Sequence, residues 1–591
     1  MRAPQFIAIP ALIGHELTRQ TLRGARSGIL YTWRYRGSPP AGFRQIPESI
    51  RPAEPEHAEQ YYCGHFHLAG VSVFASAVSP FEMDDQDLDW RSELHGFRWL
   101  RHLQAADTRL ARIHGRGLVG DWIGLWNDEF KSSAWNFETT AQRLISWLTH
   151  AHLIGATGKG EHADAVMRSI GRHLRYLRTN LAAAPHGRPR LLTVIALAFC
   201  SLILTGREKT IRGAARDLDR ELSRQIFPDG GHISRNPAFL LDLLADLLPL
   251  RDLYMDGGVA LPAQLQPTID RIHAALHFFS HSNGELAQFN GTGATPHSLM
   301  RAVMRRCEGA PKPVRSAIFS GYERLAANDT VVLMDTGKPE SRRSARRSMG
   351  GTLSFELSCA KTRFITNCGV TEARREAYAA YFRTTAAHST ATIDNTSSSK
   401  FVMPGRLRSM LPSPLLHAPK HVDAHRSDND AYQHVVASHD GYGPEFGIVH
   451  ERELFLSSDG TELNGIDRFT TIGGGHKPRD IAIRFHLPPD ISSSHLASGH
   501  SVLMAGPTGD AWTMTCIDAP MQLEESLYFS GPGKPRKTQQ IVISTNSRDH
   551  GEVRWSMSYC EAKKGRKRAA AMNKTPDLLD GLQMAELETQ D

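Results

Sequence analysis

A short polar run beside a tight turn is the first place where this sequence could do chemistry. His232, Arg235 and Asn236 follow the turn residues Asp-Gly-Gly and directly precede an apolar stretch of helical period. An imidazole titrates near neutral pH, and a guanidinium or a side-chain amide can bind a carboxylate. The run therefore predicts functional residues at the mouth of a loop. A compatible interpretation is that Asn236 caps the helix, with Pro237 at its first position.

Four further polar residues stand where chains commonly turn. His281 and Asn290 belong to SHSNGELAQFNG, which predicts a loop that lines a groove, although Ser-Asn-Gly is also an ordinary turn. His388 lies in AAHSTATID and has an alternative role as a buried, hydrogen-bonded histidine. Tyr442 ends SHDGY, where an Asp-Gly turn alone explains the pattern. All four remain candidates for a site.

The cysteines and one histidine pair do not predict a metal centre. The chain has 7 cysteines, an odd number, and no CxxC pair. Cys63, His65 and His67 alternate, so on a strand their side chains would share one face, but no fourth ligand is visible. From these residues we assign no metal ligands and no cofactor.

Composition indicates a folded protein with a mild positive charge. Hydrophobic residues make up 40% and charged residues 22%, and the formal net charge is +7. Such a balance suits an acidic polysaccharide, a nucleic acid or a membrane surface, and it also suits ordinary solubility. No apolar run approaches the ~18 residues of a membrane span, and the N-terminus lacks the pattern of a standard secretory signal. The basic run KKGRKR predicts a solvated tail rather than a nucleic-acid site.

The hydrophobic period changes twice along the chain and divides it into segments. Residues 1–60 are rich in Arg and Pro and predict an irregular lead-in, whereas the period of 61–327 is mainly helical. Residues 328–560 contain short β-branched segments separated by turn residues, which is typical of a sandwich or barrel. Residues 561–591 predict a disordered tail. Many antiparallel helices of similar length favour a toroid over a simple bundle. Five tryptophans at helical spacing could pack in the core or stack on sugar rings: Trp90, Trp99, Trp122, Trp135 and Trp147.

Several strings recur in the order of a known family. They are WRSELHGFRWL (90–100), FPDGGHISRNPAFLLDLLADLL (227–248), LSFELS (353–358), AAHSTATID (386–394), SHDGY (438–442) and RFHLPP (484–489). The set resembles the heparinase II/III-like polysaccharide lyases. The resemblance implies a multidomain α and β protein, with an N-terminal (α/α) toroid, a C-terminal antiparallel β-sandwich and a groove for an acidic polysaccharide between them.

The chemistry implied is β-elimination at a uronic acid, possible only when the neighbouring carboxylate is neutralised and a base reaches the C5 proton. On this hypothesis His232, Asn236, His388 and Tyr442 are catalytic, while Arg235, His281 and Asn290 bind substrate. The reaction needs no redox cofactor. Relatives in the cell envelope or periplasm suggest that compartment, and the N-terminus leaves a cytoplasmic one open.

Two positions depart from the family pattern. Phe239 stands where the family has a catalytic Tyr, and a phenyl ring cannot move a proton. Arg347, Ser348 and Met349 replace a His-x-His pair, so the structural zinc of some relatives is doubtful here. The alternative hypothesis is a non-catalytic glycan-binding or envelope-assembly protein. A hydrolase would need two carboxylates on either side of the bond that is cleaved, and Asp229 and Glu285 are the pair that we nominate.

Overall fold

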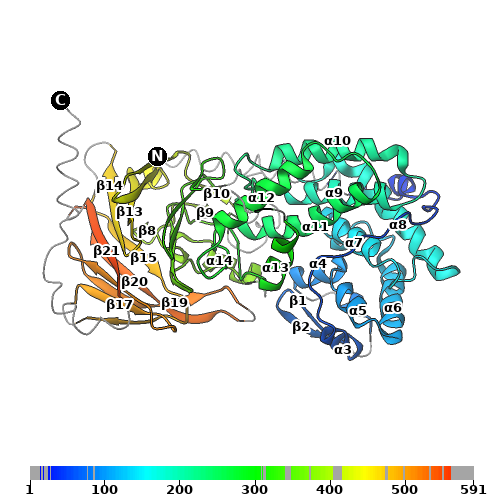
Figure 1. Cartoon of the computed structure of the whole chain (residues 1–591), viewed down its shortest axis with the longest axis horizontal. Helices are drawn as coiled ribbons and strands as arrows, with labels where there is room; N and C mark the ends of the chain where they lie inside the picture. Colours follow the sequence, from blue (N-terminus) through cyan, green and yellow to red (C-terminus); the bar gives the residue numbers. More distant parts are fainter. Residues whose placement is uncertain are drawn as a thin grey trace.

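A computed structural model describes residues 28–560 and a few single residues before them. Within that range it leaves out 76–77, 84–86, 308, 310–313, 340–347, 372–374, 403–414, 473–476, 497–498, 532–533 and 549–550. Helices make up most of the N-terminal part and antiparallel strands most of the C-terminal part, and the two parts lie side by side along the long axis (Figure 1). The predicted class of a helical domain followed by an antiparallel β domain is confirmed. The expected tail at 561–591 lies outside the described residues.

The helical part is built from helices of one to six turns. They are α2 (Ile29–Thr32), α3 (Glu56–Tyr62), α4 (Leu88–Gly96), α5 (Leu100–Ala106), α6 (Arg109–Trp126), α7 (Phe137–Thr149), α8 (Glu161–Asn180), α9 (Arg188–Ile203), α10 (Glu208–Gln225), α11 (Pro237–Asp256), α12 (Leu265–Phe279) and α13 (His297–Arg306). Single-turn 3₁₀ helices η1 (Trp33–Tyr35), η2 (Pro80–Glu82), η3 (Ser133–Trp135) and η4 (Leu181–Ala183) join them, and a hairpin of β1 (His65–Leu68) and β2 (Val71–Phe74) lies against their N-terminal end.

Helix α11 shows how the sequence specifies these elements. The side chain of Asn236 accepts a hydrogen bond from the backbone N–H of Phe239, which satisfies one of the free donors at the helix start. Pro237 occupies the first turn, where its missing N–H costs nothing. The helix is buried on nearly all sides, as its continuous run of leucines predicts. It is therefore a central element of the helical domain rather than a surface helix.

The five tryptophans belong to the core of the helical domain. Each has a side chain at most 1% exposed, so the core interpretation is confirmed. Around them lies the fully buried Arg143, whose guanidinium stands 4.0 Å above the Trp122 ring and donates to His173 and to the carbonyl oxygens of His95 and Ala134. A cation in such an aromatic shell is stabilised by the negative faces of the rings. These indoles are not available to stack on a sugar.

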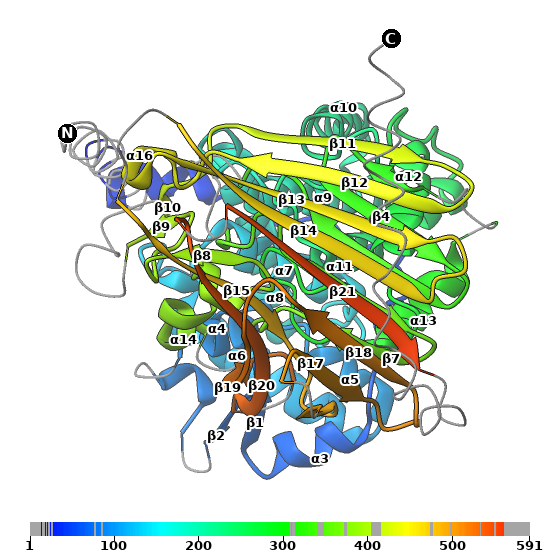
Figure 2. The same ribbon diagram turned by 90° about the vertical axis from the view of Figure 1, so that its left-hand side faces the viewer.

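The β part contains three larger antiparallel sheets. One has eight strands in the order β11-β12-β13-β14-β21-β18-β17-β16, one has four in the order β19-β20-β15-β8, and one has five in the order β3-β4-β5-β6-β7 (Figure 2). Their bounds are β3 (Ser316–Ala317), β4 (Tyr322–Ala327), β5 (Thr330–Asp335), β6 (Phe355–Cys359), β7 (Thr362–Ile365), β8 (Ala391–Ile393), β11 (Val422–Asp428), β12 (Tyr432–His439), β13 (Ile448–Ser457), β14 (Glu462–Thr471), β15 (Asp480–His486), β16 (Ser492–His495), β17 (Ser501–Ala505), β18 (Ala511–Cys516), β19 (Met521–Tyr528), β20 (Arg536–Asn546) and β21 (Glu552–Cys560). The short pair β9 (Lys400–Phe401) and β10 (Leu415–His417), helices α14 (Arg375–Phe382) and α16 (Gly443–Phe446), and η5 (Thr385–Ala387) complete the domain.

The three sheets share one apolar core. Strand β13 alternates buried and half-buried residues for most of its length, which is the pattern of a sheet with one covered face. Inside this core Asp467 is fully buried and accepts hydrogen bonds from Arg452, His450 and Trp555. Such a buried carboxylate is tolerated because every partner is a donor.

Candidate functional site

His232 closes the turn that precedes α11 and is only 1% exposed. Its Nδ1 atom accepts from the backbone N–H of Ser234, which places the ring proton on Nε2, 3.0 Å from the side-chain oxygen of Gln225. Burial and, to a smaller extent, the nearby Arg188 lower the pKa of His232 to about 3. The imidazole is therefore neutral at physiological pH, and both of its nitrogens are engaged by the protein.

Phe239 lies between His232 and Arg188 in the first turn of α11. The centres of the His232 and Phe239 rings are 4.5 Å apart, and the guanidinium carbon of Arg188 lies 4.8 Å from the centre of the Phe239 ring. The phenyl ring is 3% exposed. The position where the family resemblance places a proton-transferring tyrosine thus holds an apolar ring packed between a neutral imidazole and the guanidinium of Arg188.

A cluster of ion pairs continues from Arg188 along α11. Asp242 accepts from Arg51 at 2.7 Å, from Arg98 at 3.1 Å and from Arg188 at 2.7 Å. Burial alone would raise the pKa of this carboxyl, but the three guanidinium groups hold it well below its usual range. Further pairs join Asp246 to Arg51 and Arg98, and Glu138 to Arg188. The arginines are consequently matched by carboxylates of the same chain.

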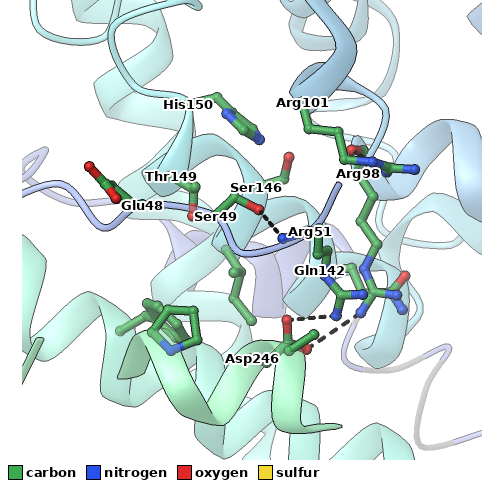
Figure 3. A pocket seen from close by; sticks show the side chains of 14 residues that line it. Glu48, Ser49, Arg51, Arg98, Arg101, Gln142, Ser146, Thr149, His150 and Asp246 are labelled. Carbon is green, nitrogen blue, oxygen red and sulfur yellow. Dashed lines mark hydrogen bonds and ion pairs between the residues drawn. The ribbon is translucent and has the colours of Figure 1, made fainter. Parts of the chain in front are cut away.

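A small cavity of about 40 Å³ lies beside this cluster (Figure 3). Arg51 and Asp246 pair at its edge, and Arg98, Arg101 and His150 contribute to its wall. Because one water occupies roughly 10–15 Å³ on this scale, the cavity holds a few waters and not a sugar ring. It does not offer a place for a polysaccharide.

Arg235 joins the helical domain to the β domain. Its guanidinium donates to the carbonyl oxygens of Ser320, Gly321, Gly337 and Lys338, and it pairs with Asp335 at the end of β5. The side chain is 6% exposed. Five acceptors thus satisfy the guanidinium within the protein, and Arg235 is a structural contact between the two domains.

Asn236 and Asn290 extend the same contact. The Asn236 amide donates to the backbone oxygen of Asn290 at 3.0 Å, and its oxygen is the helix cap described above. Asn290 in turn donates to Tyr322 at 2.6 Å and to Asp335 at 3.1 Å. Both amides are buried. Three of the residues predicted from sequence, Arg235, Asn236 and Asn290, are therefore brought together, and each is bonded to other parts of the chain.

His281 contacts the β domain at a second point. Its Nε2 lies 2.8 Å from the Glu356 carboxylate and its Nδ1 lies 2.9 Å from the Ser358 hydroxyl. Glu356 is fully buried and also accepts from the backbone and side chain of Asn367. Burial and Arg363 lower the pKa of His281 to about 4, whereas Arg363 and the His281 donor hold the pKa of Glu356 below its usual value against the effect of burial.

His388 and Tyr442 do not lie in one hydrogen-bonded group with these residues. The Nδ1 atom of His388 lies 2.8 Å from the backbone oxygen of Thr384, and burial lowers its pKa. The Tyr442 hydroxyl donates to the backbone oxygen of Ala391, and burial raises its pKa above the usual range. Both side chains are buried. Their catalytic roles remain predictions from sequence.

Sequence reasoning missed the charged partners that organise this region. Arg188, Asp242, Asp335 and Glu356 make the contacts described above, and although Asp242 and Glu356 lie within the strings 227–248 and 353–358, none of the four was singled out from sequence. A buried charge on an otherwise apolar helix, as at Asp242 in α11, was the one signal that could have revealed its partner. The partners lie from about 50 to 190 residues away, and spacing gives no information about them.

The metal candidates form no cluster. His65 and His67 are exposed on β1, where they contact Phe74 and Ser72, and Cys63 is exposed too. Ser348 and Met349 are buried, and Arg347 lies outside the described residues. Across the described chain no three His, Cys, Asp or Glu side chains are grouped to hold a metal ion. Among the same residues no helix is long and apolar enough to cross a membrane.

A family model matches the C-terminal part of the chain. Residues 309–556 match the family model described as Heparinase II/III-like, C-terminal. This C-terminal part of the chain is thus similar to the heparinase II/III-like family. A crystal structure of heparinase III superposes with a TM-score of 0.68 at 14% identity, covering 94% of this chain and 92% of that one. The toroid-plus-sandwich fold predicted from sequence is thereby confirmed.

Two further relatives cover most of the chain. A mutant of the heparan sulfate lyase HepC from Pedobacter heparinus superposes with a TM-score of 0.60 at 16% identity, over 88% of this chain and 86% of that one. A protein of Caulobacter vibrioides named FtsZ-localized protein C is 28% identical over 535 residues, which are 88% of this chain and 91% of that protein. The name of the first relative thus states an enzyme, and the name of the second states a location.

Replacing Arg235 by Ala should destabilise the junction between the domains. The change leaves Asp335 buried without its cation and removes the donors to four carbonyl oxygens, a loss of about 3–5 kcal/mol for a broken buried pair. We expect a clear fall in melting temperature measured by circular dichroism. The exposed Arg109, changed to Ala in the same way, is the control and should alter the melting temperature little. An unchanged melting temperature for Arg235→Ala would show that the contact is not structural.

Stability should fall as the pH drops below about 6.5. His232 and His281 have folded pKa values of about 3 and about 4, below the value near 6.5 of an unfolded histidine. As the pH falls below about 6.5, these histidines take up protons in the unfolded chain but not yet in the folded protein. The free energy of unfolding therefore has its full value above about pH 6.5 and declines towards pH 4. By pH 5 the loss is on the order of 1–2 kcal/mol per histidine. Melting curves from pH 7.5 to 5 test this. His232→Gln should flatten the profile, and a melting temperature independent of pH would contradict it.

Proposed function

We propose that this protein is a non-catalytic member of the heparinase II/III-like family that works as an assembly protein and localises with FtsZ. The observation that carries the proposal is the packing of Phe239. It supplies no ionisable group, and its neighbours His232 and Arg188 are held by Gln225, Ser234, Glu138 and Asp242. A lyase needs a free base at this point of the fold.

The charges around Phe239 support the same conclusion. A uronic-acid carboxylate would have to displace Glu138 or Asp242 from Arg188, and the displaced carboxylate would then be left without its partner. Removing one partner of a buried pair costs several kcal/mol. Binding of a substrate carboxylate would offset little of this free-energy cost, because Arg188 would only exchange one carboxylate for another. The cluster is therefore better suited to hold the toroid together than to bind a substrate.

The location comes from the relative in Caulobacter vibrioides. Its name, FtsZ-localized protein C, states that it localises with FtsZ, and the match runs through both domains of this chain. The two solved structures are named as a heparan sulfate lyase and as heparinase III, but their identity of 14–16% supports the fold alone. A role in assembly explains why the architecture is kept while the proton-transfer group is replaced.

A second candidate is the lyase itself, a carbon–oxygen lyase that cleaves an acidic polysaccharide by β-elimination. It is favoured by the retention of both domains, since the superposition with heparinase III covers 94% of this chain. In this case two of His232, His388 and Tyr442 would have to supply the acid and the base, and Asn236 would have to bind the substrate carboxylate. Opening of the contacts that Asn236 and Tyr442 now make would be required first.

The absence of turnover is the first expected result. Purified protein is incubated with uronic-acid polymers, including heparan sulfate, chondroitin sulfate and alginate, while ultraviolet absorbance of the unsaturated product is followed. We expect no rise for the wild type. We also expect none for Phe239→Tyr, because the new hydroxyl would still lack a free base. A commercial heparinase in parallel shows that the assay works. A rise with the wild type that is lost in His388→Ala would establish the lyase instead.

Localisation is the second expected result. A fluorescent fusion expressed in its host, with FtsZ labelled in a second colour, should form a band that coincides with FtsZ and disperses when FtsZ is depleted. His232→Gln should localise normally, because the proposal assigns that histidine to the fold. Fluorescence spread evenly through cells that have intact FtsZ bands would reject the proposed location, whatever the outcome of the lyase assay.

A further inference from the structure

Helix α6 (Arg109–Trp126) has one face that no described part of the chain covers. Ala111, Leu118 and Trp122 of this helix are buried against the toroid, where α6 packs against α5, α8 and η2. On the opposite side Leu110 is 52% exposed and Ile113 is 57% exposed. The helix lies at the end of the toroid away from the sandwich, so its outer side faces solvent (Figure 1).

The apolar residues continue along the helix as a regular seam. Leu110, Ile113, Gly117, Gly120 and Gly124 are separated by three, four, three and four residues, which is the spacing at which one helix packs against another. The two large side chains occupy the N-terminal half of the seam, and the three glycines occupy the C-terminal half. The seam therefore has projections at one end and a groove at the other.

The part of the chain that the structure describes does not explain these glycines. A Cβ atom added at Gly117, Gly120 or Gly124 would meet nothing within 4 Å, whereas one added at Gly115 would contact Leu153 and Leu103. Glycine is the poorest helix former after proline, so three unnecessary glycines in one helix lower its stability. A second helix packed close against the seam would explain the three glycines, because only glycine lets two helix backbones approach so closely.

Charges on α6 favour a particular orientation of that second helix. Arg109 and Arg116 lie in the N-terminal half, whereas Asp121 lies in the C-terminal half. Two nearby charges are already paired within the chain, Arg112 with Asp107 and Asp128 with Arg172. The order of Arg109, Arg116 and Asp121 opposes the helix dipole, which favours acids at the start and bases at the end. An antiparallel partner with the same charge order would place basic halves beside acidic halves, which is attractive.

We propose that α6 is a self-association surface through which two copies of this chain form a two-fold symmetric dimer. With the axis at Gly117, Leu110 of each copy lies over Gly124 of the second copy, and Ile113 lies beside Gly120. The surface carries both the projections and the groove that receives them, and it is therefore complementary to itself, as a two-fold interface requires. The proposal does not depend on whether the protein is a lyase.

The dimer is tested by the mass of the protein in solution. Light scattering after size exclusion at tens of micromolar should give twice the 65.5 kDa of one chain. Gly124→Leu fills the groove and should give the monomer mass, while the melting temperature stays equal or rises because leucine favours the helix. Gly213→Leu on α10, another position where a Cβ meets nothing, is the matched control and should remain dimeric.

Cross-linking tests the position of the axis. In a Cys63→Ser background, which removes an exposed thiol, Gly117→Cys should form a disulfide-linked dimer under mild oxidation, because the two thiols meet at the axis. Gly213→Cys should not. A wild type that is monomeric at these concentrations would overturn the proposal. So would a dimer that persists in both Gly124→Leu and Ile113→Asp, or that fails to cross-link at Gly117→Cys.

Discussion

The buried guanidinium of Arg235 makes the contact that fixes the two domains relative to each other. It reaches Ser320, Gly321, Gly337 and Lys338 and pairs with Asp335, so one side chain holds a β-turn, the end of β5 and the start of α11 together. Arg235 adopts a positive φ of 54°, a conformation that costs an L-residue about 1–2 kcal/mol. The acceptors compensate for this strain. A Cβ at Gly337 would lie 2.4 Å from the guanidinium, so only glycine fits against it.

This contact has a consequence for the surface between the domains. The side chains that could recognise a carboxylate, Arg235 and Asn290, meet Asp335 of the same protein there, and His281 meets Glu356. Buried pairs of this kind contribute little net stability in themselves, but breaking one is costly because it leaves a desolvated charge. The boundary is therefore held in one arrangement. Arg235, Asn290 and His281, which could have bound a substrate in a groove, instead bind Asp335 and Glu356 and fix the boundary between the domains.

The sequence predicted the elements better than their contacts, for a physical reason. Helical and strand periods are local, so the change from helices to strands, the Asn236–Pro237 start of α11 and the burial of the tryptophans follow from neighbouring residues. The partners of Arg235 and His281 lie 75 or more residues away, and no period encodes them. The family resemblance located the right segments, but it could not show that Asn236, His281 and His388 are buried and hydrogen-bonded within the chain.

Phe239 and Arg188 pack against each other as one unit. A tyrosine that transfers protons must keep its hydroxyl available to the substrate. A hydroxyl that is kept without a hydrogen-bond partner in the protein lowers the stability of the fold. A phenyl ring has no such requirement, so Arg188 can lie against its face while pairing with Glu138 and Asp242. Both side chains then contribute to the packing of α9 and α11. The phenyl ring and the ion pairs of Arg188 with Glu138 and Asp242 are thus two aspects of the same packing between the first turns of α9 and α11.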